Sequence, residues 1–177
     1  MSSQPSPLGR YDKGSGLDRS VHEVRLIGVP VQVLIASRQH HDDLMREFTV
    51  LAVSEPDLRS SVPQRLTALT QILGVRYGAT ASRPDKLIDE AAQRGERTLD
   101  LTYQVPGDVV EAADQLEALM AEADEFCCTE QMLALPRSPL QVQFAHWYLD
   151  EFRRQVNGQP PRPWTGPLSS GTDVSCS

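Results

Sequence analysis

The residues of this chain best suited to chemistry form one cluster, His40-His41-Asp42-Asp43. Histidine beside carboxylates can bind a metal ion or move a proton near neutral pH. On a helix, His40, Asp43 and Glu47 share one face, because they stand at positions i, i+3 and i+7. His41 falls on the apolar side of the same helix. The three polar residues on the shared face are therefore candidate binding residues.

A metal or catalytic role for this cluster needs further groups, which the sequence does not supply. A metal site needs at least three convergent ligands, and the other histidines, His22 and His146, are distant in sequence. No serine-centred elbow, His-Glu-x-x-His motif or Walker loop occurs. We therefore assign no catalytic residue, no metal and no cofactor. The sequence favours a non-enzyme, with a hydrolase using His40 and Asp43, or a metal-binding protein, as an alternative.

Charge narrows the kinds of partner. The formal net charge is −7 and the pI is near 5.0, which argues against binding to nucleic acid or to an anionic membrane, since both need clustered Lys and Arg. The acids gather between residues 108 and 125, in a predicted helix without Lys or Arg. This face is either a solvated surface or a site for a basic protein partner. Its candidate binding residues are Glu111, Asp114 and Glu117.

Hydrophobic patterning predicts the elements that position these residues. Apolar or alternating runs predict strands at 24–29, 98–105 and 131–135. Apolar residues at helical spacing, often after a proline, predict helices at 30 to about 52, 63 to 74 or 78, 84–95, 108 to about 127, and 138–152. We expect an α+β fold, in which three short strands form a small sheet and about five helices pack largely on one face.

Composition predicts the limits of the folded domain and its compartment. Residues 1–21 and 158–177 are rich in Ser, Gly and Pro and are predicted to be disordered tails, which leaves a single domain at 22–157. The cysteines have neither a disulfide-framework spacing nor a metal-ligand spacing, and no apolar run approaches the ~18 residues that span a bilayer. We expect a soluble, cytoplasmic protein.

Four stretches suggest a family: RLIGVPV at 25–31, HHDDLMREF at 40–48, LTYQVP at 101–106 and WYLDEF at 147–152. Together they resemble small actinobacterial proteins found with partner-switching regulators, in which kinase-type anti-sigma factors, antagonist domains and phosphatases control stress responses. The resemblance covers about residues 22–160 and brings no active-site residues. It implies a regulatory or protein-binding role in the cytoplasm.

The leading hypothesis is a non-enzymatic interaction protein in bacterial signalling or transcriptional control, with a protein partner that presents a basic surface. The alternative from another class is a small-ligand sensor, whose pocket would lie between the sheet and the helix that carries His40.

Overall fold

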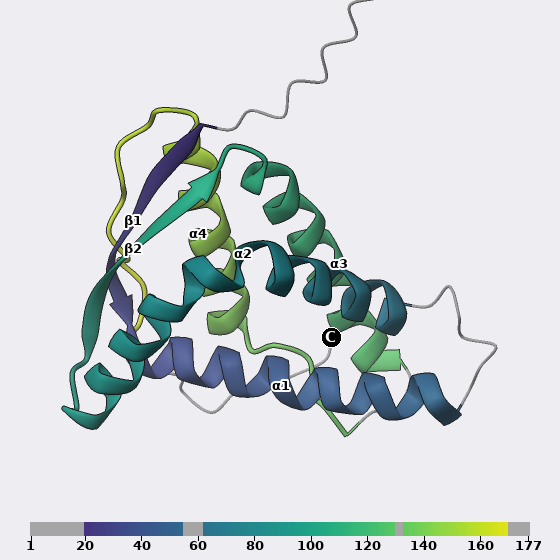
Figure 1. Ribbon diagram of the computed structural model, residues 1–177. Coiled ribbons are helices and arrows are strands. Elements are labelled where there is room, and N and C mark those ends of the chain that lie inside the picture. The colour runs from purple at the N-terminus through teal and green to yellow at the C-terminus, as the bar shows by residue number, and fades with distance from the viewer. Residues whose placement is uncertain (1–19, 55–61, 130–132, 170–177) are drawn as a thin grey trace, which may run out of the picture.

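The computed structural model describes residues 20–54, 62–129 and 133–169. Within these ranges the elements follow in the order β1, α1, α2, β2, α3, α4 (Figure 1). Their bounds are β1 Val21–Pro30, α1 Val31–Ser54, α2 Val62–Gln93, β2 Thr98–Pro106, α3 Val109–Thr129 and α4 Pro139–Val156. The α+β class predicted from the sequence is confirmed.

The sheet is an antiparallel pair of β1 and β2, in which Leu26 faces Leu101. Alternate residues of β2 are buried, as the period of two predicts. The register shifts between Leu26 and Val29, where Gly28 has a φ of +71° and its N–H donates to Oδ1 of Asp100 at 2.7 Å. Glycine adopts this φ easily because it has no Cβ, so the bulge in β1 depends on Gly28.

The prediction of a third strand is wrong for the part of it that the structure describes. Residues 131 and 132 lie outside the described residues, and the chain bends at Leu133 and Ala134 instead of forming a strand. The backbone N–H groups of these two residues donate to the Glu47 carboxylate, at 2.8 and 2.6 Å. Because a side chain satisfies these donors, they need no neighbouring strand.

The two helices predicted at 63 to 74 or 78 and at 84–95 are one continuous helix, α2, with Pro84 inside it. Proline suits the first turn of a helix, but inside a helix it removes one backbone hydrogen bond and bends the axis without always ending it. Figure 1 shows that α2 changes direction along its length. Gly95, the predicted stop, follows the helix with a φ of +67°, as a glycine C-cap does.

Buried side chains form two clusters. The first lies at the sheet and is closed by α4, with contributions from Leu26, Leu101, Phe144, Phe152 and Trp164. The second lies among α1, α2 and α3, with contributions from Leu44, Phe48, Leu66, Leu119, Ala123 and Cys127. The helices therefore pack partly on the sheet and partly on one another.

Residues 158–169 are not the disordered tail that their composition predicts. They run beside β1 and α4 (Figure 1). Trp164 is only 9% exposed, and its backbone N–H donates to the carbonyl of Ile27 at 2.9 Å. Its ring centroid lies 5.3 Å from that of Trp147. The aromatic anchor outweighs the Pro- and Gly-rich composition around it, because burying one indole removes a large apolar area from water.

An ion pair between a buried carboxylate and the exposed Arg162 also holds this segment. Glu151 of α4 is fully buried, and its carboxylate accepts hydrogen bonds from the backbone N–H and the Nε of Arg162, at 2.9 and 3.0 Å. A buried carboxylate needs such donors to offset the loss of its hydration. The N-terminal tail was predicted to reach residue 21, but Val21 already belongs to β1. Residues 1–19 and 170–177 of the predicted tails lie outside the described residues.

Candidate functional site

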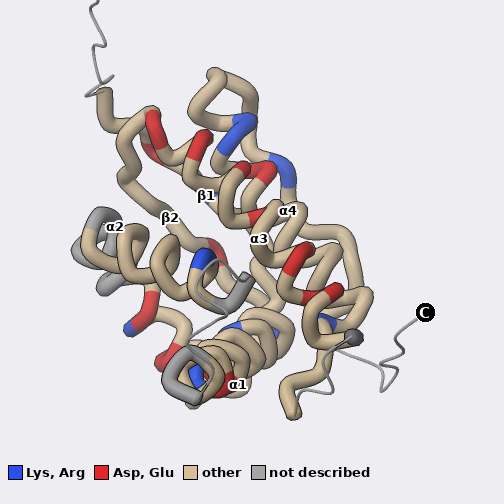
Figure 2. The backbone as a smooth tube through the Cα atoms, turned by 90° about the vertical axis from the view of Figure 1, so that its right-hand side faces the viewer, with Lys and Arg blue, Asp and Glu red and all other residues tan. Residues whose placement is uncertain are grey.

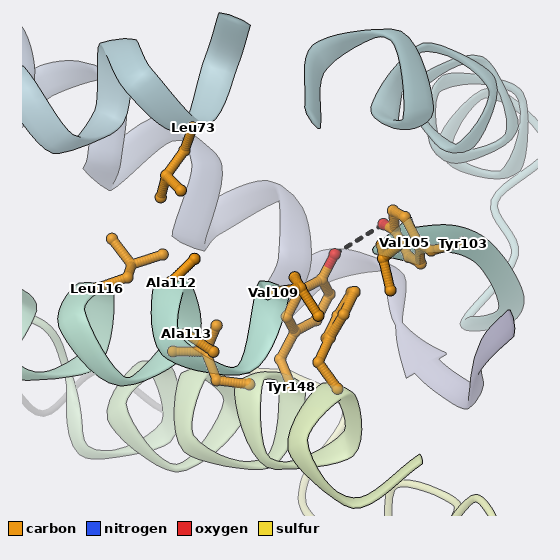
Figure 3. A pocket seen from close by; sticks show the side chains of 10 residues that line it. Leu73, Tyr103, Val105, Val109, Ala112, Ala113, Leu116 and Tyr148 are labelled. Atoms are coloured by element: carbon orange, nitrogen blue, oxygen red, sulfur yellow. Dashed lines mark hydrogen bonds between the residues drawn. The ribbon is translucent and has the colours of Figure 1, made fainter. Parts of the chain in front are cut away.

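The candidate site is an apolar pocket of about 340 Å³ between β2, α2, α3 and α4 (Figure 3). Carbon-rich side chains form its wall: Leu73, Tyr103, Val105, Val109, Ala112, Ala113, Leu116, Tyr148, Leu149 and Phe152. No residue of α1 lines it. The sequence-based alternative placed a pocket between the sheet and the helix that carries His40; the present pocket borders the sheet but not that helix.

The local sequence explains why space remains here. Tyr103 and Val105 point to the same side of β2 because they are two residues apart. The part of the wall on α3 includes Ala112 and Ala113, whose short side chains leave room in front of α4. Figure 3 shows Leu73 of α2 across the pocket from α3.

The pocket has a buried inner end and a half-buried rim. Val105 and Phe152 at the inner end are 3% and 6% exposed, whereas Leu73, Ala112 and Leu116 are half-buried. A small molecule would therefore enter between α2 and α3, with its inner part shielded from water.

One hydrogen bond lies in this apolar wall: the hydroxyl of Tyr148 donates to that of Tyr103 at 2.7 Å (Figure 3). Burial raises the pKa of Tyr103 and raises that of Tyr148 well above its ordinary value. Both hydroxyls therefore keep their protons at neutral pH. The ion pair of Arg38 with Asp85 lies close enough to act on both hydroxyls electrostatically.

His40, Asp43 and Glu47 all line one shallow groove beside α1, but each side chain makes different contacts. Asp43 pairs with Arg46 at 2.9 Å, and Glu47 binds the two backbone N–H groups of residues 133 and 134. His40 turns inward, and its Nε2 is buried without a hydrogen-bond partner among the described residues. The shared helix face was predicted from the spacing, but the roles of its residues are separate.

His40 lines a small internal cavity of about 40 Å³ with Ser37, Asp124 and Arg137. The Oγ of Ser37 is likewise buried, with no hydrogen-bond partner in the part of the chain that the structure describes. Asp124 is bound by Arg137, whose Nη2 lies 2.7 Å from its Oδ2. Serine, histidine and aspartate are the residue types of a hydrolase, but this cavity holds little more than a water molecule. The predicted hydrolase alternative used His40 and Asp43, and Asp43 does not line this cavity. That alternative stays a prediction.

A shallow groove of about 660 Å³ lies on the other side of His40, between α1 and residues 133–135. Its wall combines the charged side chains of Asp43, Arg46 and Glu47 with the exposed Val50 and Leu133. It lacks the buried inner end of the apolar pocket.

Two acidic residues of α3 are paired with basic residues of α4. Arg153 of α4 binds Asp114 at 2.6 Å and Glu117 at 2.5 Å, and His146 lies 2.7 Å from Glu117. Hydrogen bonds from Arg153 and His146 lower the pKa of Glu117 against the opposing effect of burial. Figure 2 shows the acidic positions of α3 beside basic positions of α4.

Glu111 lies one turn before these pairs, and its carboxylate accepts a hydrogen bond from Gln115 at 3.3 Å. The ion pairs of Asp114 and Glu117 could not be predicted from the sequence of this helix, because their partner Arg153 is 39 and 36 residues away from them. Asp114 and Glu117 are thus paired with Arg153 of α4, whereas Glu111 lies in the first turn of α3.

The cysteines differ from one another. Cys127 is free and buried, and burial raises its pKa to about 11, which suits an unreactive packing residue. Cys128 is disulfide-bonded, which the cysteine spacing did not predict.

Sequence reasoning missed the apolar pocket as a site. The signal that the chain does carry is the adjacent pair Ala112 and Ala113, opposite the aromatic Tyr148 and Phe152 in the fold. Only the tertiary arrangement shows that these residues surround a space.

No family model, curated protein or solved structure matches this chain. The resemblance to companions of partner-switching regulators therefore stays a prediction. Among the described residues, no group of three or more His, Cys, Asp or Glu is placed to hold a metal ion. None of the described helices combines the length and the apolar character needed to cross a membrane.

Proposed function

We propose that this protein is a non-enzymatic regulatory protein that senses a small apolar molecule bound in the pocket between β2, α2, α3 and α4. The observation that carries this proposal is the pocket itself, since its inner end is buried and its wall is almost entirely carbon. Burial of apolar surface would supply the binding free energy, at about 25 cal/mol per Å².

The pocket volume limits the size of the ligand. Its 340 Å³ is roughly twice that of the about 150 Å³ engineered cavity that takes up benzene. The ligand is therefore expected to contain one or two rings, or a short branched chain. The pocket lies between elements that are far apart in the sequence. Ligand binding would therefore stabilise the packing of these elements on one another, and this change in packing would carry the signal.

The test measures unfolding free energy with ethylbenzene and naphthalene as probes, for the wild type and for Ala112→Phe. A ligand at one hundred times its dissociation constant should stabilise the wild type by about 2.7 kcal/mol. The phenyl group of Ala112→Phe would occupy the pocket, so this variant should show little or no stabilisation.

The matched control is Ala118→Phe, which adds the same ring to the exposed side of α3 and should leave the ligand effect intact. If neither probe stabilises the wild type, or if both variants respond as it does, the pocket is not a ligand site.

A second candidate function is protein binding, in which the acidic face of α3 contacts a basic surface on a cytoplasmic signalling regulator. The observation in its favour is that Asp114 stays 63% exposed even though it pairs with Arg153. Glu111 is exposed on the same helix. Charge reversal by Glu111→Lys should weaken capture of that regulator from the native host, because it places like charges opposite one another.

The control for this experiment is Asp89→Lys, which reverses an exposed charge on α2. Equal capture by both variants would count against a partner on the acidic face.

A further inference from the structure

We infer that the molecule bound in the apolar pocket carries one uncharged hydrogen-bond acceptor, such as a ketone or ether oxygen, which binds the hydroxyl pair of Tyr103 and Tyr148. This inference rests on the proposed function and adds the chemical class of the ligand. It makes the two tyrosines the residues that determine specificity.

The hydrogen count of the pair carries the argument. Two hydroxyls bring two hydrogens, and the bond of 2.7 Å between them uses only one. Within the described part of the chain, neither hydroxyl has a further hydrogen-bond partner. Whichever oxygen donates to the other, one hydrogen therefore remains for a ligand.

Burial makes this remaining donor costly to leave unpaired. Tyr103 is 7% exposed and Tyr148 is half-buried, and the other side chains that line the pocket are apolar. A buried donor without an acceptor costs about 1 to 3 kcal/mol. A ligand that presents an acceptor at this end of the pocket recovers that free energy, and a pure hydrocarbon does not.

The same surroundings exclude a charged group at this end. Tyr103 lies against Phe152 and Tyr148, with ring centroids 5.4 and 6.2 Å away. An ionised group placed among these rings would lose its hydration, and the nearby Arg38 and Asp85 are already paired with each other, so it would gain no free counter-ion. The acceptor should accordingly be neutral.

The experiment compares acetophenone with ethylbenzene, which have the same carbon skeleton and differ in one carbonyl oxygen. Dissociation constants are measured by NMR titration of the full chain and of the double variant Tyr103→Phe with Tyr148→Phe. The ratio of the ethylbenzene constant to the acetophenone constant isolates the effect of the acceptor. We expect this ratio to be about three- to tenfold larger in the wild type than in the double variant.

The double variant is the appropriate one, because each single variant leaves a hydroxyl whose hydrogen is free to reach the ligand. Tyr103→Phe and Tyr148→Phe should each keep the preference for acetophenone. Removing both hydroxyls leaves no unpaired partner, so the double variant should fold and bind ethylbenzene about as tightly as the wild type.

The outcomes separate the two proposals. An equal ratio in the wild type and the double variant, with ethylbenzene still bound, overturns the acceptor inference and leaves the pocket as a ligand site. If neither probe binds the wild type, the proposed function itself fails.

Discussion

At the scale of single residues, burial sets the direction of the pKa shift of His40, on which Asp124 and Arg137 have opposite effects. Asp124 raises the pKa of His40, whereas burial and the neighbouring Arg137 lower it. Burial is the largest effect, so the pKa is lowered and the folded protein holds the neutral imidazole. The carboxylate of Asp43 is nearby but too weak an influence to reverse this. His40 therefore contributes to the pH dependence of folding.

Acid should destabilise the protein through this residue. In the unfolded chain His40 titrates near its ordinary pKa of 6.5, and in the folded chain it titrates lower. Between these two values the unfolded state binds more protons, so the unfolding free energy falls as the pH falls from 6.5 toward the folded pKa. His40→Gln removes this titration. Its unfolding free energy, measured by urea between about pH 8 and about pH 5, should fall less than that of the wild type.

The neighbouring His41 also has a pKa lowered by burial, so some acid sensitivity should remain in His40→Gln. Replacing both histidines by Gln should flatten the dependence further. The explanation would be wrong if the single and double variants lost as much stability on acidification as the wild type does.

At the scale of elements, Glu47 accepts the backbone hydrogen bonds that a neighbouring strand would otherwise accept from Leu133 and Ala134. Its carboxylate accepts from two successive backbone N–H groups and so fixes the bend after α3 against α1. These are charge-assisted hydrogen bonds, which are stronger than those between neutral groups.

Glu47→Gln should loosen this connection. Glutamine offers one carbonyl oxygen, and its NH₂ group would face a backbone N–H that also donates. We expect a loss of about 1 to 3 kcal/mol in unfolding free energy and faster hydrogen exchange at the amides of Leu133 and Ala134. Asp43→Asn is the control on the same helix, since it breaks an exposed ion pair worth about 1 kcal/mol or less. Unchanged exchange at both amides would contradict the anchoring role of Glu47.

Local patterns predicted most of the elements, because β2 alternates with a period of two and α4 begins with a Ser138 capping box. They failed where a distant group decided the outcome. The bend at residue 133 is held by a carboxylate 86 residues away. The apolar pocket could not be predicted for the same reason, since residues from separate elements enclose it. The pairing of Arg153 with α3 likewise depends on how two helices meet.

At the scale of the whole molecule, the last described segment completes the core at the sheet. Trp164 packs on Phe144 and Trp147, with ring centroids 5.7 and 5.3 Å away. Its indole Nε1 donates to the carbonyl of Pro167 at 3.1 Å, so the polar edge of the ring is satisfied where it is buried. The folded unit therefore extends beyond the predicted boundary at 157 and includes residues 158–169.

Trp164→Ala should destabilise the whole fold rather than release one end of it. The substitution removes a buried indole from the cluster that also contains Leu26 and Phe144, and changes of this kind cost about 3 to 5 kcal/mol. Urea unfolding followed by far-UV circular dichroism should show a lower midpoint in one cooperative transition. The exposed Thr165, changed to Ala, should shift stability by no more than about 0.5 kcal/mol. If Trp164→Ala unfolded at the wild-type midpoint, the segment would be an attachment to the fold and not a part of its core.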